Sequence, residues 1–366
     1  MPTARAIAFY LPQFHPIPEN DEWWGKGFTE WTNTAKARPM FRGHYQPHIP
    51  ADLGFYDLRV PETRVRQAEM ARAYGIEGFC YYHYWFAGRR VLERPFGEVL
   101  ASGDPDFPFC LCWANETWSG VWHGAPNKTL IEQTYPGEAD HRAHFAALLP
   151  AFRDPRYIQV DGKPMFIIYK PLQVQEVGDT LRLWRSMAAE AGLAGLHLVG
   201  CSNGSSEDFS TAGYDATIHS SELKQRRWRN DWRNPYVRIQ QKINHYLGMP
   251  HVRSYADLVA EQKARPGASN IYPSIVHAWD NTPRSGKNGV AYKDSSPELF
   301  RKALGSVVEA VSGRPEDRRV VFLKSWNEWA EGNHLEPDLR HGTAYLQAVA
   351  DVLIPEGGRL IPSLPD

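Results

Sequence analysis

The chain has 366 residues and a formal net charge of −1, with 41 Lys and Arg against 42 Asp and Glu. A chain of this length can bury a sizeable core, either as one α/β barrel or as two average domains. The balanced charge excludes the global positive field expected of a protein that binds nucleic acid or an anionic membrane. Aromatic residues make up 13% of the chain, with 13 Trp, which provides both core and stacking surface for sugars.

The beginning of the chain bears on localisation. The apolar run 6–11 is too short for the apolar core of a signal peptide and continues into polar sequence. No stretch approaches the roughly 20 apolar residues of a membrane span. We therefore expect a cytoplasmic protein without a membrane span, or a periplasmic one if a signal peptide has been removed.

Eight short β-rich runs follow one another along the chain, and helical patterns separate most of them. The runs cover residues 6–11, 78–84, 107–113, 165–169, 197–201, 216–219, 272–277 and 320–325. The helical patterns cover residues 61–74, 137–152, 180–191, 296–311 and 342–353. Alternating strands and helices predict a parallel sheet, and eight repeats favour a (β/α)8 TIM barrel over an open doubly wound sheet. No Gly-x-Gly-x-x-Gly follows the first run, which argues against a dinucleotide fold.

We expect residues 1–366 to form a single barrel domain with long loops at the C-terminal face. The two longest connections are residues 12–60 and 222–269. Long loops in compact domains are usually functional or disordered, and the aromatic residues of the first loop argue against disorder.

The four cysteines point to no metal site and no cofactor. Three of them lie inside apolar runs, where a free Cys behaves as a small hydrophobe. No second Cys or His pair completes a zinc-binding spacing. The cysteines are Cys80, Cys110, Cys112 and Cys201.

Polar and aromatic residues follow each predicted strand. In a barrel these strand ends converge on one face, where barrel enzymes hold their catalytic groups. Side chains of this kind can bond sugar hydroxyls and stack on sugar rings. We predict substrate-binding roles for His15, Trp31, His83, Tyr84, Trp85, Trp113, Asn115, Glu116, Lys170, Trp279, Asp280, Trp326 and Asn327. Alternatives are that His83 and Trp113 belong to the core, that Glu116 caps a turn and that Lys170 is a surface residue.

Glu328 and Glu331 follow the last apolar run and lie among tryptophans. Paired carboxylates in an aromatic setting are what glycosidic bond chemistry requires. Burial raises carboxyl pKa values, and a neighbouring carboxylate separates a pair into an acid and a base. A helical turn would place both side chains on one face, whereas an extended segment would not. The alternative is a pair of surface carboxylates at the start of a helix.

Several longer motifs resemble the WbsX family, whose members are described as polysaccharide-cluster glycosyltransferases and as glycoside hydrolase family 99-like. The resemblance runs from about residue 5 to residue 350. Its motifs lie at residues 9–20, 23–31, 46–57, 113–116 and 326–332.

Glycoside hydrolase family 99 proper contains endo-α-mannosidases and endo-α-mannanases, (β/α)8 barrels with a Glu-x-x-Glu pair after the last strand. The resemblance implies that Glu328 takes the proton of the sugar 2-hydroxyl, which attacks its own anomeric carbon to give a 1,2-anhydro sugar. It implies that Glu331 protonates the leaving oxygen and then activates water, so that the configuration is retained. Ala330 departs from family 99, which usually has His at this position.

Three functions remain open from the sequence. The first is a retaining glycoside hydrolase or transglycosylase, endo-α-mannosidase-like, that acts on a bacterial polysaccharide or oligosaccharide. The second is a glycosyltransferase of O-antigen or polysaccharide biosynthesis. The sequence shows no Asp-x-Asp metal motif in a Rossmann-like half and no phosphate-binding glycine loop, although the basic segment 224–229 could meet a pyrophosphate. The third is a non-catalytic glycan-binding barrel.

Overall fold

The computed structural model describes residues 2–120, 129–203, 207–220, 239, 246–261 and 268–355. The basic segment 224–229 and most of the predicted loop 222–269 lie outside the described residues.

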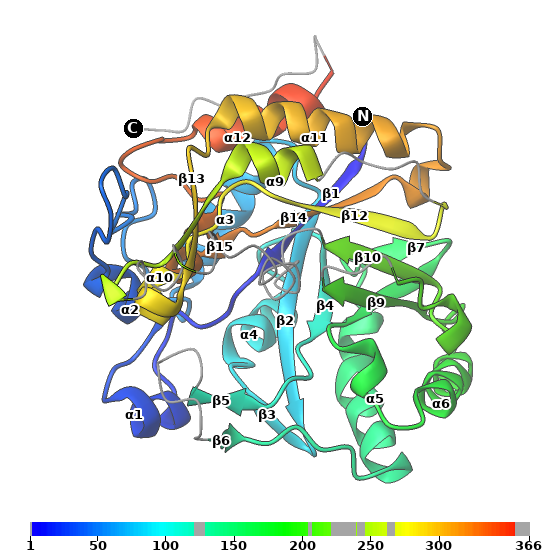
Figure 1. Ribbon diagram of the computed structural model, residues 1–366. Helices are drawn as coiled ribbons and strands as arrows, with labels where there is room; N and C mark the ends of the chain where they lie inside the picture. The colour runs from blue at the N-terminus through cyan, green and yellow to red at the C-terminus, as the bar shows by residue number, and fades with distance from the viewer. Residues whose placement is uncertain are drawn as a thin grey trace.

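Eight parallel strands form a closed barrel (Figure 1). They are β1 (Arg5–Tyr10), β2 (Gly78–Phe86), β4 (Phe109–Trp113), β8 (Lys163–Ile168), β9 (His197–Asn203), β10 (Ala216–Ser220), β12 (Ile271–Val276) and β14 (Val320–Lys324). The sheet closes because β1 pairs in parallel with both β14 and β2. The TIM barrel and all eight predicted strands are confirmed, each within a few residues of its predicted bounds.

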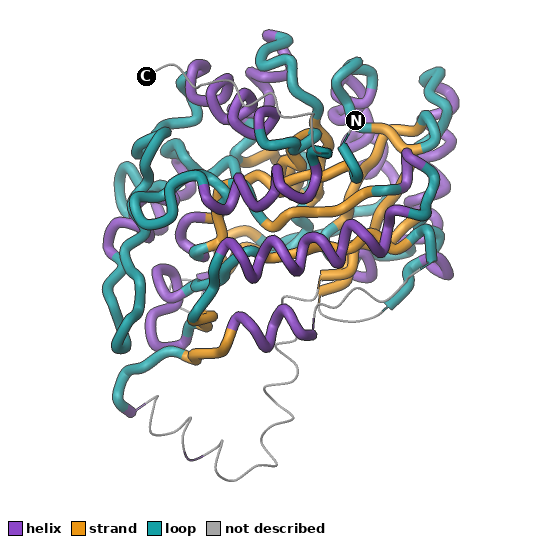
Figure 2. The backbone as a smooth tube through the Cα atoms, turned by 90° about the horizontal axis from the view of Figure 1, so that it is seen from above, coloured by secondary structure: helices purple, strands orange, loops and turns teal. Residues whose placement is uncertain are grey.

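Helices surround the barrel, as the view from above shows (Figure 2). They are α3 (Pro61–Ala73), α4 (Arg94–Ser102), α5 (Glu138–Phe152), α6 (Val177–Glu190), α9 (Tyr255–Glu261), α11 (Pro297–Ser312) and α12 (Ala344–Leu353). Helix α11 begins where expected, because the Ser296 hydroxyl accepts a hydrogen bond from Leu299 N at 3.3 Å and proline occupies the first turn. The five helices predicted from the sequence are confirmed, whereas α4 and α9 were not predicted.

The barrel strands are buried along nearly their whole length, as both faces of a helix-covered parallel sheet must be. Every residue of β4 and β14 is buried. The four cysteines are buried free thiols within or beside this core, which confirms their interpretation as small hydrophobes.

Additional short elements lie beyond the barrel strands. The first long loop contains α1 (Pro18–Trp24) and α2 (Glu30–Lys36), so it is ordered as its aromatic residues predict. After the seventh barrel strand comes α10 (Thr282–Ser285), and after the eighth a hairpin of β15 (Asn327–Glu328) and β16 (Asn333–His334). The remaining short strands are β3 (Arg89–Val91), β5 (Trp118–Ser119), β6 (Thr129–Ile131), β7 (Gln159–Val160), β11 (His251–Ser254) and β13 (Val290–Lys293).

Within the described part of the chain, none of the helices combines the length and the apolar character needed to traverse a lipid bilayer.

Substitution of two glycines by alanine tests how closely strand β2 packs against the segments beside it. A Cβ added at Gly78, the first residue of β2, would collide with the Pro108 carbonyl and lie 2.9 Å from the Ile158 side chain. Gly78→Ala should therefore lower the free energy of unfolding by about 1–3 kcal/mol in urea denaturation. Gly97→Ala in helix α4 is the matched control, since an added Cβ meets nothing within 4 Å, and it should be neutral or slightly stabilising. Equal losses for both variants would contradict the packing described.

Candidate active site

A cavity of about 390 Å³, here called the barrel cavity, lies at the C-terminal end of the barrel. Its lining comes from the ends of several strands and from the loops that follow them, which is where barrel enzymes hold their catalytic groups. Its lining includes Gln13, Asn20, Trp24, Asn33, Tyr82, Tyr84, Glu116, Trp118, Tyr169, Trp279, Arg284, Lys324, Glu328 and Glu331.

The chain places Glu328 and Glu331 together through one tight turn. Residues Trp329–Glu331 form a single 3-10 turn between β15 and β16. Gly332 ends the turn with a φ of 56°, and a Cβ there would meet Asp280 Cβ at 3.0 Å. The two glutamates are only 5% and 6% exposed. Glu328 ends strand β15 and Glu331 ends the 3-10 turn, so the chain turns between the two glutamates, and their burial contradicts the alternative of surface carboxylates at a helix start.

Arg284 joins three carboxylates. Its Nη1 donates to Glu331 Oε1 at 2.6 Å, and its Nη2 donates to Glu328 Oε2 at 2.9 Å. The same Nη2 donates to Glu30 Oε1 at 2.6 Å. Arg284 lies in α10, the loop helix that follows the seventh barrel strand. Buried carboxylates require such a partner, because an unpaired charge in the interior is very costly.

Glu30 is fully buried and belongs to the same cluster. It is the first residue of α2, a helix whose start is fixed by reciprocal hydrogen bonds between Thr29 and Thr32. Its Oε1 also accepts the backbone N–H of Ala330 at 2.9 Å, so it holds the turn that separates the two other glutamates. Burial raises the pKa of Glu30, although Arg284 opposes the shift.

The sequence analysis did not predict Glu30 or Arg284 as site residues. The signal for Glu30 was available, because it lies inside the aromatic motif 23–31 that carries the family resemblance. Arg284 follows the seventh strand by several residues, and nothing in its local sequence distinguishes it from a surface arginine.

Burial and the neighbouring carboxylate of Glu331 raise the pKa of Glu328 to about 8, against the opposing charges of Arg284 and Lys324. The raised pKa favours the protonated form of Glu328 at neutral pH, as expected of a desolvated carboxyl beside a second carboxylate.

Side chains alternate between the two faces of strand β2, and this alternation decides which residues at its C-terminal end reach the barrel cavity. Tyr82 and Tyr84 line it, whereas His83 and Trp85 point to helix α5 on the other side of the strand. His83 Nε2 lies 2.9 Å from His144 Nε2, and Trp85 Nε1 donates to Asp140 at 3.1 Å. Burial lowers the pKa of His83 to about 3, as expected of a neutral core histidine.

Of the predicted residues at the ends of β4 and β8, some line the barrel cavity and others do not. Trp113 is 1% exposed and packs edge-on against His144. Asn115 ties the two strand ends together, since its Nδ2 donates to the Lys170 carbonyl at 2.9 Å and its Oδ1 accepts Lys170 N at 2.8 Å. Glu116 lines the barrel cavity and pairs with the Lys170 ammonium at 3.0 Å. Trp113, Asn115 and Lys170 are not among the lining residues.

Four further predicted residues do not line the barrel cavity. Asn327 joins the end of β1, where its Oδ1 accepts Leu11 N at 2.7 Å and its Nδ2 donates to Leu11 O at 3.0 Å. Trp31 packs against Trp329 with ring centroids 5.2 Å apart. His15 and Trp326 are buried and do not line the barrel cavity.

Trp279 and Asp280 face different spaces. Trp279 lines the barrel cavity and also a second cavity beside it, and Lys324 Nζ lies 5.2 Å from the centre of its ring. Asp280 lines the second cavity, where its Oδ2 lies 2.6 Å from His44 Nε2 and accepts from Gln46 Nε2 at 2.7 Å. Of the residues predicted to bind or act on substrate, the structure brings Tyr84, Glu116, Trp279, Glu328 and Glu331 together around the barrel cavity.

The fold is shared with solved glycoside hydrolases. A structure described as a glycoside hydrolase-like protein aligns with a TM-score of 0.58 and 16% identity, over 95% of this chain and 93% of that one. The GH99 endo-alpha-mannosidase of Bacteroides thetaiotaomicron, solved with BIS-TRIS-propane, also gives a TM-score of 0.58 and 16% identity, over 95% of both chains. At this identity the likeness concerns the fold.

The sequence places the chain more narrowly. The family model described as Glycosyltransferase WbsX matches residues 6–349, and the chain belongs to this family. The uncharacterized protein WxcX from two strains of Xanthomonas campestris pv. campestris is 39% identical over 352 residues, which are 96% of this chain and 50% of WxcX. The chain thus spans about half the length of the curated relatives it matches.

Unfolding measurements can test how far the three buried carboxylates depend on Arg284 for the stability of the fold. Arg284→Met leaves three buried carboxylates without their shared cation, so it should cost about 3–5 kcal/mol of stability. The loss should be smaller at pH 5 than at pH 9, because protonation at low pH relieves the unpaired charges. Thermal unfolding across this pH range measures both effects.

Arg301→Met is the control for this experiment. Arg301 is exposed on helix α11, and its loss should change stability by less than about 0.5 kcal/mol at either pH. A pH-independent loss in Arg284→Met would contradict the charge-pairing role.

Proposed function

We propose that this chain is a retaining glycoside hydrolase that cleaves an oligosaccharide or polysaccharide with Glu328 and Glu331. The observation that carries the proposal is the pair of buried carboxylates that meet on Arg284 at the C-terminal end of the barrel. Glycoside hydrolysis requires two carboxyl groups in different protonation states. Aromatic rings around the barrel cavity supply the stacking surface that a sugar needs, namely Trp24, Tyr82, Tyr84, Trp118, Tyr169 and Trp279.

The proposed first step forms a 1,2-anhydro sugar. Glu328 removes the proton of the sugar 2-hydroxyl while that oxygen attacks the anomeric carbon, and the bond to the leaving oxygen breaks. Glu331 gives its proton to the leaving oxygen. The attack is intramolecular, so it has the large effective molarity of a well-oriented reaction.

The proposed second step restores the enzyme. Water attacks the anomeric carbon, Glu331 takes its proton, and the bond from the anomeric carbon to the 2-oxygen breaks. That oxygen recovers its proton from Glu328. Two inversions give net retention without a covalent bond to the enzyme.

The raised pKa of Glu328 suits a base that acts on an alcohol. A carboxylate with a pKa of about 8 accepts a proton more readily than one with the ordinary value, and catalytic pKa values near the working pH are the most efficient. Arg284 contacts both glutamates and Glu30, so it fixes their positions for the two proton transfers.

A second candidate function is favoured by the description of the family as glycosyltransferases. The same carboxylate pair can pass the sugar to a hydroxyl of another sugar instead of to water. Transglycosylation would use an oligosaccharide donor, whereas a synthetic transferase would require a nucleotide-linked or lipid-linked donor.

Substitution of the two glutamates tests the catalytic assignment. The parent chain should release new reducing ends from mannose-rich or O-antigen-type oligosaccharides. Glu328→Gln and Glu331→Gln should each lower this activity by about 10²–10⁴-fold, because each removes a proton transfer, while both still bind the oligosaccharide. Glu309→Gln, an exposed position on helix α11, is the control and should keep full activity.

Three outcomes would overturn the hydrolase proposal. If both site variants cleave as fast as the parent, the catalytic residues lie elsewhere. If an acceptor glycan gains mass only when a nucleotide sugar is present, the chain is a transferase. If the chain binds oligosaccharide and turns over neither donor, it is a glycan-binding barrel.

The pH dependence of kcat/KM tests whether the two glutamates act together as a base and an acid. The first step needs Glu328 without a proton and Glu331 with one, so the pair must hold one proton between its two carboxyls. Since burial and the neighbouring Glu331 raise the pKa of Glu328 to about 8, the rate should fall as the pH passes about 8 and the pair loses its last proton. A rate that stays constant between pH 7 and pH 9.5 would contradict proton transfer from the pair to the leaving oxygen.

A further inference from the structure

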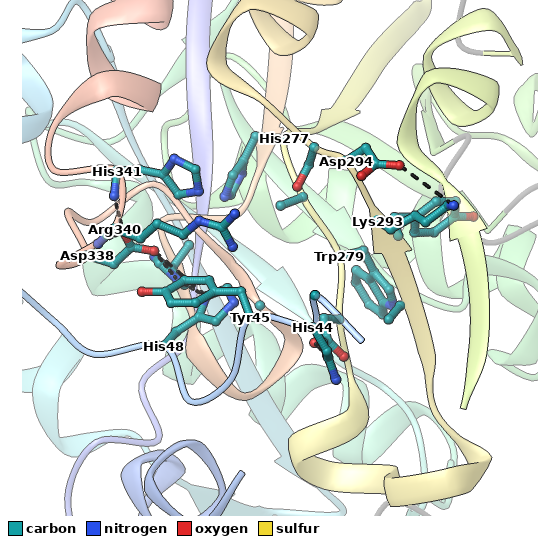
Figure 3. A pocket seen from close by; sticks show the side chains of 18 of the residues that line it. His44, Tyr45, His48, His277, Trp279, Lys293, Asp294, Asp338, Arg340 and His341 are labelled. Atoms are coloured by element: carbon teal, nitrogen blue, oxygen red, sulfur yellow. Dashed lines mark hydrogen bonds and ion pairs between the residues drawn. The ribbon is translucent and has the colours of Figure 1, made fainter. Parts of the chain in front are cut away.

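A second cavity of about 560 Å³, here called the histidine cavity, adjoins the barrel cavity at Trp279, which lines both. Figure 3 shows side chains that line the histidine cavity. Five of the 14 histidines of the chain line it. They are His44, His48, His277, His334 and His341. The proposed hydrolysis uses none of them, so their concentration in one place calls for a separate explanation.

Three side chains in this cavity point ligand atoms at one another. His48 Nδ1 lies 2.8 Å from His334 Nε2, and Asp338 Oδ2 lies 4.0 Å from each of these nitrogens. Among the described residues this is the group of His, Cys, Asp and Glu side chains whose ligand atoms lie close enough together to hold a metal ion.

The other polar atoms of His334 and Asp338 are already engaged. His334 Nδ1 lies 2.9 Å from the Glu336 carbonyl, so this nitrogen carries the hydrogen and Nε2 offers a lone pair. Asp338 Oδ1 accepts the backbone N–H groups of Arg340 at 2.9 Å and His341 at 2.6 Å, which leaves Oδ2 directed at the imidazoles. Histidine ligands of metals are oriented in this way, by donating their second nitrogen to a carbonyl.

The positions of the three side chains are fixed by packing and by backbone pairing. His334 stacks on Trp329 with ring centroids 3.6 Å apart, and Tyr45 stacks on His48 at 4.5 Å. The loop that carries His48 pairs with the segment of Asp338, since Leu339 N donates to Ile49 O at 2.9 Å and Pro50 bridges to Asp338. The side chains of His48, His334 and Asp338 are 12%, 5% and 4% exposed.

We propose that His48, His334 and Asp338 bind a divalent transition-metal ion, with Zn²⁺ as the expected ion. The three atoms form a triangle with sides of 2.8, 4.0 and 4.0 Å, and the point in its plane that is equidistant from them lies about 2.1 Å from each. Zn–N bonds of about 2.0–2.1 Å and Zn–O bonds of about 2.0–2.2 Å match this value. Two imidazoles and one carboxylate favour such a metal over Ca²⁺ or Mg²⁺, which prefer oxygen ligands.

The metal would lie behind the carboxylate pair. His334 belongs to β16, the strand that pairs with β15 and its Glu328, whereas His48 belongs to the first long loop. One ion bound to both would join the glutamate hairpin to that loop. Binding of the ion is expected to stabilise the hairpin. The histidine cavity leaves room for a water molecule as a further ligand of the ion.

Metal titration of the full chain tests the site without recourse to activity. After treatment with EDTA and removal of the chelator, calorimetric titration with zinc chloride should show one ion bound per chain. Saturating zinc should raise the melting temperature, because a ligand that binds the folded state stabilises it. Cobalt(II) should give visible absorption bands whose intensity reports a low coordination number.

Two substitutions identify the ligands. Asp338→Asn keeps the Oδ1 acceptor for the backbone of residues 340 and 341, and His48→Phe keeps an aromatic ring against Tyr45. Loss of an outer-sphere partner typically costs 10–100-fold in metal affinity, so loss of a ligand should cost at least about 100-fold. Circular dichroism checks that each variant is folded.

His44→Gln is the matched control from the same cavity. Both nitrogens of His44 are engaged, because Nδ1 accepts Met40 N at 3.0 Å and Nε2 contacts Asp280 at 2.6 Å. This variant should bind zinc like the parent. The proposal is overturned if the parent binds no stoichiometric zinc, or if folded Asp338→Asn and His48→Phe bind it as tightly as the parent. Since the readout is metal content and stability, neither result bears on the proposed hydrolysis.

Discussion

The contact of Arg284 with Glu30, Glu328 and Glu331 is the constraint on which the site depends. Three carboxylates beside one guanidinium carry an excess of two negative charges, and the raised pKa of Glu328 reduces this excess by favouring its protonated form. Glu30 comes from α2, Arg284 from α10, and the other two glutamates from the end of β15 and the turn that follows it. Because the buried carboxylates need the charge of Arg284, three segments that are distant in sequence must meet over the end of the barrel.

The hairpin that carries the glutamates has two environments. Glu328 and Glu331 line the barrel cavity, whereas His334 lines the histidine cavity and stacks on Trp329 within the same turn. A cation held by His334 and the first long loop would stabilise the hairpin from the side opposite the substrate. In this account Arg284 positions the carboxylates from one side and the histidine cavity supports their backbone from the other.

The barrel and the glutamate pair were predictable from the sequence because both signals are local. Apolar runs and helical periods mark each strand and helix, and Glu328 and Glu331 are three residues apart. Arg284 and Glu30 are 254 residues apart, and His48 and His334 are 286 apart, so only the closed barrel brings them together. Consecutive residues at the strand ends were predicted to bind substrate together. Successive side chains of a strand point to opposite faces, so Tyr82 and Tyr84 reach the barrel cavity and His83 and Trp85 do not.

A sugar-bound crystal structure of the Glu331→Gln variant tests the central claim most directly. The account predicts a sugar in the barrel cavity whose 2-hydroxyl oxygen lies within about 2.6–3.2 Å of a Glu328 carboxyl oxygen, the distance at which a proton can be transferred. The anomeric oxygen should face residue 331. A sugar whose 2-hydroxyl points away from Glu328, or one bound in the histidine cavity instead, would contradict the account.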